Sequence, residues 1–293
     1  MRYVLITAAR NEETTIEKTI QSVISQTILP KIWVIVSDGS TDRTDEIVKQ
    51  YEDNYDFIRI LLRKNNTSRD FASKVYAIRA GVEQLNGTEY DYIGNLDADI
   101  TFNPEYYERL FEIFGENPKL GIAGGIVFEP HNGKWAPLRT NVALSVSGAT
   151  QMFRRQCYDA IGGYLPLPKG GEDAIAEVMA RRYGWEVKTF SQLEVFHCRE
   201  VGTANGGLYS ARINLGMEHY SLGYTLWFEI ARCLSRIKKS YILAELSTLW
   251  GYLLAFLRRD KTAVPEDIRE YVRQEQIGRL KNAFRIKRLR PQK

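Results

Sequence analysis

The segment Ile32–Asp42 has the sequence Ile-Trp-Val-Ile-Val-Ser-Asp-Gly-Ser-Thr-Asp, and it decides the fold class. Its apolar first half is typical of a strand that is buried on both faces of a sheet. Its polar second half supplies turn residues, after which Ser40 or Thr41 is expected to cap a helix that runs to about Tyr51. A buried strand that leads directly into a helix is the repeating unit of parallel sheets.

The same alternation of strand and helix extends on both sides of this segment. Apolar runs predict strands over residues 4–7, 32–36, 58–62 and 90–96, and amphipathic stretches predict helices over residues 14–24, 41–51, 69–85 and 103–114. We therefore predict an α/β, Rossmann-like domain with a mainly parallel central sheet and helices on both faces. Ligands of such sheets bind beyond the carboxyl ends of the strands, and the polar motifs of this sequence fall there.

The pattern becomes less regular after Gly121. Strands are expected over residues 122–128, 145–153 and 187–196, and a helix over residues 172–183. From about Met217 onward the sequence is helical. We therefore predict a catalytic domain over residues 1–216 and a helical C-terminal extension over residues 217–293.

Composition bounds the class of protein. The formal net charge is +4 over 293 residues, which does not argue for nucleic-acid binding, and no nucleic-acid partner is expected. The three cysteines, Cys157, Cys198 and Cys233, include no CxxC pair, which fits a reducing compartment better than a disulfide framework or a thiolate zinc site. Because the first residues lack the features of a secretory signal, we expect a cytoplasmic protein.

Acidic residues follow two of the expected strands. Asp38 lies at a strand tip beside Gly39, where it could accept hydrogen bonds from the N–H groups of a nucleobase; the alternative is a tight turn that Asp38 caps. Asp97 and Asp99 follow the strand over residues 90–96, and both carboxylates can reach one hard cation such as Mg²⁺ or Mn²⁺. The alternative for this pair is two solvated aspartates before a turn.

Other polar residues are candidates on weaker patterns. Glu172 and Asp173 open a helix, where Asp173 could act as the general base for an acceptor hydroxyl and Glu172 could orient the acceptor; ordinary helix capping is the alternative. His197 follows the strand over residues 187–196 and could complete a metal site, although an ordinary loop histidine has the same pattern. Lys74 could contact a diphosphate or simply lie at the surface.

In their order and separation these motifs resemble the family 2 glycosyltransferases, which are inverting, nucleotide-sugar-dependent enzymes with the GT-A fold. The resemblance covers roughly residues 1–200 and rests on the segments Thr7-Ala8-Ala9-Arg10-Asn11-Glu12-Glu13, Val36-Ser37-Asp38-Gly39-Ser40-Thr41-Asp42, Asp97-Ala98-Asp99 and Glu172-Asp173. It implies a GT-A fold for the catalytic domain and a divalent cation, Mg²⁺ or Mn²⁺, as cofactor.

The resemblance also implies roles on the donor side. Ala8 and Ala9 would line the pocket for the nucleotide base, and Glu12 would contact the nucleotide or support this loop. Asp38 would hold the base. Lys74 stands where members of the family often carry a basic residue near the nucleotide.

Further roles are implied for the metal and the acceptor. Asp97 would contact the ribose or the water shell of the metal, and Asp99 would ligate the metal directly. His197 stands where some members supply a histidine to the metal, and Asp173 matches the acidic residue that acts as general base. The acceptor side would be bordered by Ser147, Gly148 and Glu172.

The implied activity is transfer of a sugar from a nucleoside-diphosphate donor, expected to be a UDP-sugar, to a hydroxyl of a glycan or lipid-linked acceptor in polysaccharide or glycoconjugate biosynthesis. The Gln-x-x-Arg-Trp motif of processive synthases is missing after Asp173, which favours single additions. Two alternatives stay open: a sugar-nucleotide nucleotidyltransferase, which would usually carry a Gly-rich loop after the first strand, and a non-catalytic protein that binds nucleotide sugars.

The segment Tyr241–Leu257 is strongly apolar, and basic residues flank it on both sides. It is shorter than the roughly 20 residues that a membrane-spanning helix needs. Together with the basic tail from Arg279 to Lys293, it predicts peripheral contact with the cytoplasmic face of a membrane through residues 236–259 and the C-terminus. The alternative is a hairpin buried against the catalytic domain or against another subunit.

Overall fold

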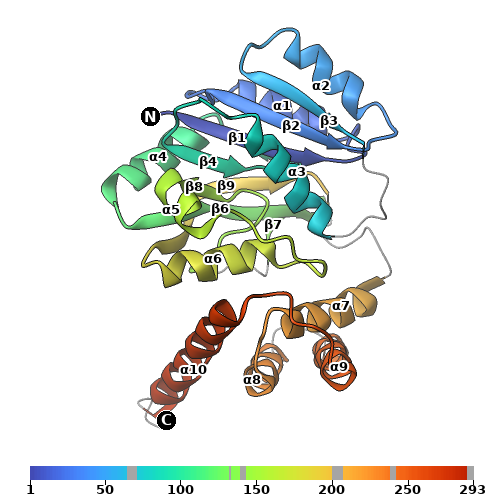
Figure 1. Ribbon diagram of the computed structural model, residues 1–293, viewed down its shortest axis with the longest axis vertical. Coiled ribbons are helices and arrows are strands. Elements are labelled where there is room, and N and C mark those ends of the chain that lie inside the picture. The colour runs from blue at the N-terminus through green and yellow to red at the C-terminus, as the bar shows by residue number, and fades with distance from the viewer. Residues whose placement is uncertain (65–70, 132, 139–142, 200–206, 238–241, 289–293) are drawn as a thin grey trace. The chain divides into compact units, whose positions relative to one another are not determined.

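The computed structural model describes residues 1–293 except 65–70, 132, 139–142, 200–206, 238–241 and 289–293 (Figure 1). The chain divides into two compact units. Unit 1 comprises Met1–Pro166 and Glu172–Val201, and unit 2 comprises Leu167–Gly171 and Gly202–Lys293. Unit 1 contains the sheet, whereas unit 2 is helical.

The described part of unit 1 contains one nine-stranded sheet with the order β3-β2-β1-β4-β8-β6-β9-β5, and β7 pairs with β6. The strands are β1 Tyr3–Ala9, β2 Ile32–Asp38, β3 Ile58–Arg63, β4 Tyr92–Asn95, β5 Ile100–Phe102, β6 Leu120–His131, β7 Lys134–Pro137, β8 Met152–Arg154 and β9 Glu186–His197. Strands β5, β7 and β8 run against the others. The sheet is therefore mainly parallel, as the alternation of strands and helices predicts.

Helices cover both faces of this sheet, because buried residues of β1 point alternately to each side. The helices of unit 1 are α1 Ile16–Ile24, α2 Thr44–Glu52, α3 Phe71–Glu83, α4 Tyr106–Glu116, α5 Arg155–Ile161 and α6 Glu172–Arg182. On one face, Leu5 belongs to the apolar cluster that α1, α2 and α4 complete. On the other face, Ile6 packs so closely on α3 that a side chain at Gly81 would overlap it. The predicted α/β class is confirmed.

One expected strand is mostly a loop. Residues 145–153 were expected to be extended, but β8 contains only Met152–Arg154. A turn precedes it, in which the Thr150 backbone N–H donates to the Ser147 carbonyl at 3.0 Å. The carbonyl of Gly148 accepts instead from the Asn95 side chain. Residues 145–151 therefore form a loop beside the end of β4, and the backbone N–H groups of Asn95 and Asp97 donate to its carbonyls. We call it the 145–151 loop.

Unit 2 contains helices α7 Gly207–Ser221, α8 Leu226–Arg236, α9 Ile242–Arg258 and α10 Glu266–Arg288. Helices α7 and α9 cross in backbone contact, since a Cβ at Gly216 would overlap the Thr248 carbonyl and one at Gly251 would overlap the Ile213 carbonyl. Helix α7 runs without interruption through the expected domain boundary at residue 216. Among the described residues, no helix is both long enough and apolar enough to cross a membrane.

Candidate functional site

The Asp99 and His197 side chains meet because two short strands pair. Asp99 directly precedes β5, and the antiparallel ladder places Ile100 opposite His197. The Cys198 backbone N–H donates to the Asp99 carbonyl at 2.8 Å, which continues the ladder by one step. As a result, the Asp99 Oδ1 and His197 Nε2 atoms lie 3.4 Å apart, and both side chains are largely buried. Two of the predicted metal ligands are therefore neighbours.

The hydrogen bond of the other ring nitrogen suits His197 for metal binding. His197 Nδ1 lies 2.5 Å from the Arg199 carbonyl oxygen, which can only accept, so Nδ1 carries a proton. In the neutral imidazole, Nε2 then presents its lone pair towards the Asp99 carboxylate. Metal-binding histidines are usually oriented by such a bond to a carbonyl or carboxylate. A cation between Nε2 and Oδ1 would satisfy both acceptors, so these residues fit a divalent cation.

Arg199 and Glu12 extend this cluster, and Arg199 is a residue that the sequence patterns do not identify. Arg199 Nε lies 2.6 Å from Asp99 Oδ2, and an Arg199 terminal nitrogen lies 2.8 Å from Glu12 Oε1. The other Glu12 oxygen accepts from the Thr15 hydroxyl at 2.9 Å. Burial and the Asp97 charge raise the pKa of Asp99, against the opposing effects of His197 and Arg199. The cluster thus contains two carboxylates that share one guanidinium.

A second cluster surrounds Lys74. Its Nζ atom lies 2.6 Å from Asp97 Oδ1. Burial by itself lowers the pKa of Lys74, but the charges of Asp97, Glu172 and Asp173 outweigh it and the net shift is upward. Burial raises the pKa of the Glu172 carboxyl group, and the positive charge of Lys74 partly opposes this shift. Because Asp97 also acts on Asp99, it links the two clusters electrostatically.

Asp173 is held at the first turn of α6 by the 145–151 loop. The Gly148 backbone N–H donates to Asp173 Oδ2 at 3.2 Å, and the Ala174 backbone N–H donates to Asp173 Oδ1 at 2.7 Å. Any Cβ at position 148 would lie 2.6 Å from Asp173 Oδ2. The close approach therefore requires glycine, and the two backbone N–H groups orient the carboxylate.

Glu177, one turn further along α6, fixes the same loop. It accepts hydrogen bonds from the Val146 backbone at 2.6 Å and from the Ser145 hydroxyl at 3.1 Å. Burial raises the pKa of Glu177 to about 7, against the opposing Val146 hydrogen bond. The sequence patterns do not single out Glu177, although its spacing of four from Asp173 places both on one helical face.

The nucleotide-side candidates lie at the ends of β1 and β2. Ala8 and Ala9 pair with Val36 and Ser37 in the parallel ladder, so their backbones lie beside the strand that carries Asp38. Asp38 Oδ1 forms an ion pair at 2.8 Å with Arg63, which stands opposite it in the β2–β3 register. The partner of Asp38 follows from this register and could not be inferred from sequence spacing.

The loop after β1 connects these two regions of the site. The Asn11 side chain accepts from the Thr41 backbone N–H at 2.8 Å, and the Glu12 backbone N–H donates to the Thr44 hydroxyl at 2.8 Å. Glu12 also reaches Asp99 through Arg199. The candidate residues from β1, β2 and β4 thus follow the carboxyl ends of neighbouring parallel strands, where doubly wound sheets bind their ligands.

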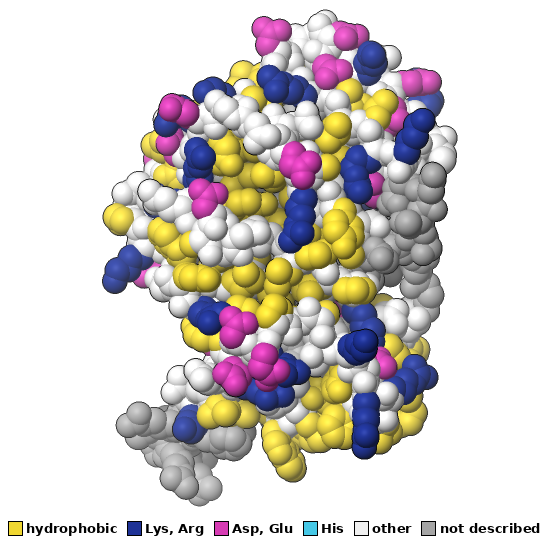
Figure 2. Space-filling model, in the orientation of Figure 1, with side chains coloured by type: hydrophobic (Ala, Val, Ile, Leu, Met, Phe, Trp, Pro, Cys, Tyr) yellow, Lys and Arg dark blue, Asp and Glu magenta, His cyan; other side chains and the backbone are white. Residues whose placement is uncertain are grey.

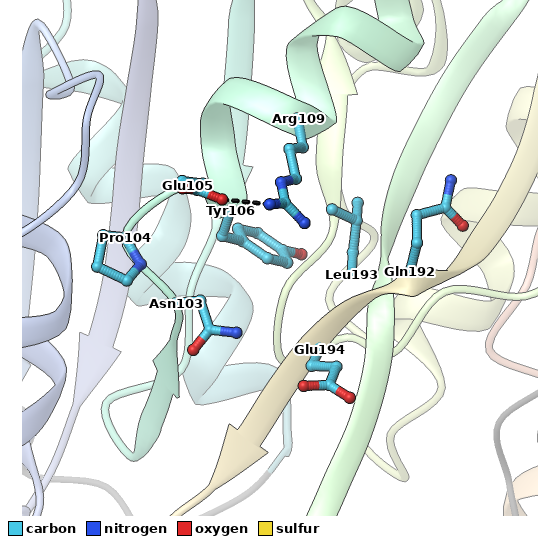
Figure 3. A pocket seen from close by; sticks show the side chains of 8 residues that line it. All are labelled: Asn103, Pro104, Glu105, Tyr106, Arg109, Gln192, Leu193 and Glu194. Carbon is cyan, nitrogen blue, oxygen red and sulfur yellow. Dashed lines mark hydrogen bonds and ion pairs between the residues drawn. The ribbon is translucent and has the colours of Figure 1, made fainter.

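A separate cavity of about 270 Å³ lies elsewhere on unit 1 (Figure 3). Asn103, Pro104 and Arg109 line it on the side of α4, and Gln192 and Glu194 line it on the side of β9. Figure 3 shows the Glu105–Arg109 ion pair over the ring of Tyr106. None of the candidate residues lines this cavity, so it carries no part of the site described above.

Comparison with known proteins establishes the class. The chain belongs to glycosyl transferase family 2, whose family model matches residues 4–168, more than half of the chain. A poly-beta-1,6-N-acetyl-D-glucosamine synthase of Staphylococcus epidermidis is 34 % identical over 118 residues, which cover 40 % of this chain and 26 % of the synthase. The chain therefore matches about a quarter of the length of that relative. The predicted family is confirmed.

Solved structures agree on the fold. The S. aureus TarS fragment 1–349 in complex with UDP-GlcNAc superimposes with a TM-score of 0.56 at 18 % identity, covering 74 % of this chain and 65 % of TarS. The mannosyltransferase PcManGT from Pyrobaculum calidifontis, in complex with GDP-Man and Mn²⁺, has a TM-score of 0.56 at 13 % identity and covers 94 % of this chain and 84 % of its own. Unit 1 therefore has the GT-A fold of glycosyltransferases.

Proposed function

We propose that the protein transfers a sugar from a nucleoside-diphosphate donor, a UDP-sugar, to a hydroxyl of a glycan or lipid-linked acceptor in polysaccharide or glycoconjugate biosynthesis. The observation that carries this proposal is the linked pair of clusters at the carboxyl ends of the strands. Asp99 and His197 form one cluster, Lys74 and Asp173 belong to the other, and Asp97 acts on both. This arrangement provides a positive charge for a diphosphate, ligands for a cation and a carboxylate that can accept a proton, all in one region of a family 2 domain.

The nucleotide binds at the ends of β1 and β2. The backbones of Ala8 and Ala9 border the base, where Ala8 offers a small, partly exposed side chain and that of Ala9 is buried in the core. The buried Asp38 accepts hydrogen bonds from the N–H groups of the base. The ion pair with Arg63 at 2.8 Å orients the Asp38 carboxylate. Glu12 supports the loop after β1 through its backbone hydrogen bond to Thr44. Lys74 and Asp97 contact the ribose and diphosphate part of the nucleotide.

Asp99 and His197 would hold the divalent cation, Mg²⁺ or Mn²⁺. Within the described residues, no cluster of three or more His, Cys, Asp and Glu side chains could hold a metal. Two protein ligands are enough where diphosphate oxygens and water complete the coordination shell, as is usual for Mg²⁺. When bound, such a cation stabilises the negative charge that develops on the leaving diphosphate.

Asp173 removes the acceptor proton. The acceptor oxygen attacks the anomeric carbon as its proton passes to the Asp173 carboxylate, and the bond from that carbon to the diphosphate oxygen breaks with its electron pair leaving on the diphosphate. The Gly148 N–H orients Asp173 for this transfer, and Ser147 and Glu172 border the acceptor. A single displacement of this kind inverts the anomeric configuration.

The donor can be tested directly. Thermal-shift titrations with UDP- and GDP-sugars, with and without Mn²⁺, should show Mn²⁺-dependent stabilisation by a UDP-sugar. Release of UDP in the presence of candidate acceptors then measures turnover, and proton NMR of the product anomer reports the stereochemistry. Stabilisation by none of the nucleotide sugars in either condition would remove the transferase proposal, and retention of configuration would remove the single displacement.

We further propose that unit 2 contacts the cytoplasmic face of a membrane through residues 236–259 and the basic C-terminus, of which residues 238–241 and 289–293 lie outside the described residues. Helix α9 buries Glu245 and Thr248, whereas Leu243, Leu246 and Trp250 on its other side are exposed. Figure 2 shows hydrophobic side chains gathered over α8 and α9 with Lys or Arg side chains beside them. Basic side chains beside an apolar face match an anionic lipid surface.

Flotation with vesicles tests this contact. The protein should float together with vesicles that contain phosphatidylglycerol. With neutral phosphatidylcholine vesicles at high salt, it should stay at the bottom of the gradient. Replacing Leu246 and Trp250 by Glu should abolish flotation, whereas Glu replacements at the exposed Leu62 and Tyr76 of unit 1 should not. A wild-type protein that never floats, or that forms a dimer disrupted by the Leu246 and Trp250 changes, would exclude the lipid contact.

A further inference from the structure

Arg199 places a guanidinium against the carboxylate that is proposed to bind the cation. It contacts Asp99 Oδ2 at 2.6 Å and Glu12 Oε1 at 2.8 Å, so one arginine bridges two acidic residues. The third group at the cluster, His197, faces the remaining Asp99 oxygen at 3.4 Å. In this arrangement the positive charge of Arg199 already neutralises much of the negative charge that would attract a divalent cation.

The side chains of Asp99, Glu12 and Arg199 differ in how freely they can rearrange. The Asp99 and Glu12 side chains are 3 % and 9 % exposed, whereas the Arg199 side chain is 50 % exposed. Glu12 is also fixed by the Thr15 hydroxyl, and Asp99 by the ladder between β5 and β9. The two carboxylates therefore form the fixed part of the cluster. Arg199 is the member that can leave without unpacking the core.

A divalent cation at Asp99 and a guanidinium on the same carboxylate repel each other, and the burial of the Asp99 side chain, which is 3 % exposed, weakens the screening of this repulsion by solvent. The diphosphate of a donor offsets this repulsion, because it brings negative charge to the coordination positions of the cation that no protein side chain fills. Cation and diphosphate are then expected to help each other bind, and by linkage the help is mutual.

We propose that Arg199 is a tethered competitor of the divalent cation, which occupies Asp99 and Glu12 in the donor-free protein and makes cation binding depend on the nucleotide diphosphate. This inference rests on the proposed function, because it takes Asp99 and His197 as the cation site. Its consequence is a protein that binds free Mn²⁺ weakly and binds it well only together with a nucleoside diphosphate.

The test measures Mn²⁺ binding by electron paramagnetic resonance, without any turnover. Mn²⁺ is titrated into the full-length protein with and without UDP, and the signal is corrected for the Mn²⁺–UDP complex measured without protein. In the wild type, UDP should raise the Mn²⁺ affinity at least about tenfold, which is about 1.4 kcal/mol. In Arg199→Ala, the affinity without UDP should itself rise about tenfold, and the effect of UDP should shrink.

Matched variants make the outcome decisive. Arg199→Lys keeps the charge and should remain close to wild type, and Arg109→Ala removes one positive charge from a surface ion pair outside the site and should leave Mn²⁺ binding unchanged. As a second readout, Mn²⁺ alone should raise the melting temperature of Arg199→Ala more than that of the wild type. Equal or weaker Mn²⁺ binding by Arg199→Ala without UDP would overturn the inference, since Arg199 would then support Asp99 rather than compete for it.

The same experiment separates this inference from the proposed cation site. Asp99→Asn should lose Mn²⁺ binding both with and without UDP. If Asp99→Asn bound Mn²⁺ as the wild type does, the cation site would lie elsewhere and that part of the proposed function would fail. If Asp99→Asn lost binding while Arg199→Ala gained none, the site would stand and only the competition would be wrong.

Discussion

The Gly148 backbone N–H donates a hydrogen bond to Asp173 Oδ2 at 3.2 Å, and a Cβ at position 148 would lie only 2.6 Å from the same oxygen. The absence of a side chain at one residue therefore sets the position of the carboxylate at the other. Such an arrangement orients the proposed base through backbone N–H groups, and it makes the loop before β8 as relevant to turnover as the helix that carries Asp173.

Gly148→Ala should reduce turnover more than it reduces stability. The added methyl group must displace the Asp173 carboxylate, so we expect kcat to fall about 100-fold, which corresponds to ~2.7 kcal/mol, with little change in the donor KM. Steady-state kinetics of UDP release measure the effect. The matched change Gly115→Ala in α4 has open space around it and should leave kcat unchanged. A Gly148→Ala enzyme with normal kcat would show that the Gly148–Asp173 contact is not needed.

Asp99→Asn and Asp173→Asn should separate donor binding from chemistry. Loss of the proposed metal ligand should weaken binding of UDP with Mn²⁺ and also lower kcat. Loss of the proposed base should lower kcat by about 10²–10⁴ and leave UDP affinity near that of the wild type. Isothermal titration with UDP and Mn²⁺, combined with single-turnover rates, distinguishes the two patterns. Near-normal turnover of Asp173→Asn would remove this residue from the mechanism.

Lys74→Met should weaken nucleotide binding. The change leaves Asp97, Glu172 and Asp173 without the positive charge that acts on all three, so these carboxylates would repel a diphosphate. Loss of a charge-assisted contact of this kind corresponds to about 1.5–3 kcal/mol of UDP binding, or roughly 10- to 100-fold in Kd. The exposed Lys49→Met in α2 controls for net charge. Unchanged UDP affinity in Lys74→Met would place the diphosphate elsewhere.

Glu177 should make the protein less stable as the pH rises towards neutrality. Burial, opposed by the Val146 hydrogen bond, raises the pKa of Glu177 in the folded state to about 7, above its ordinary value of 4.5. The folded protein therefore binds more protons than the unfolded chain between these values. Stability from this group is present in full below about pH 4.5 and is lost as the pH rises through about 7, with a slope of at most about 1.4 kcal/mol per pH unit.

Glu177→Gln removes this titration while the side-chain oxygen still accepts from the Val146 and Ser145 donors. Urea unfolding from pH 4.5 to 8 should give nearly equal free energies for the two proteins at the acid end and a more stable variant at the neutral end. Burial also raises the pKa of Asp99 and Glu172, so part of the pH dependence should remain in the variant. Parallel curves for the two proteins would contradict the prediction.

The positions of the main site residues follow from the sequence because they depend on chain order. Alternation of strands and helices places Asp38 and Asp97 after parallel strands, and carboxyl ends of parallel strands share one edge of the sheet. For the same reason the family and the α/β class could be predicted. The roles of these residues as base holder and ribose contact stay predictions.

Residues that depend on register or tertiary contact could not be predicted. Arg63 forms an ion pair with Asp38 because the β2–β3 register places the two residues opposite each other. Their separation of 25 residues in the sequence does not indicate this register. Strand β5 has three residues, which is too short for a period to be recognised, yet it places Asp99 beside His197. The contact between Arg199 and Asp99 likewise depends on the pairing of β5 with β9. Glu177 is the exception, because a spacing of four from Asp173 was a usable signal.

The pairing of β5 with β9 constrains how this site can vary in related chains. Residues alternate between the two faces of a strand, so insertion or deletion of a single residue within residues 194–197, after the irregularity in β9, would turn the imidazole to the opposite face of the sheet. The connecting loops between Asp99 and His197 can change in length, provided that the phase of this short ladder is preserved. A search for proteins that share this chemistry should therefore ignore the distance in sequence between the two residues and ask whether strand pairing would bring them face to face.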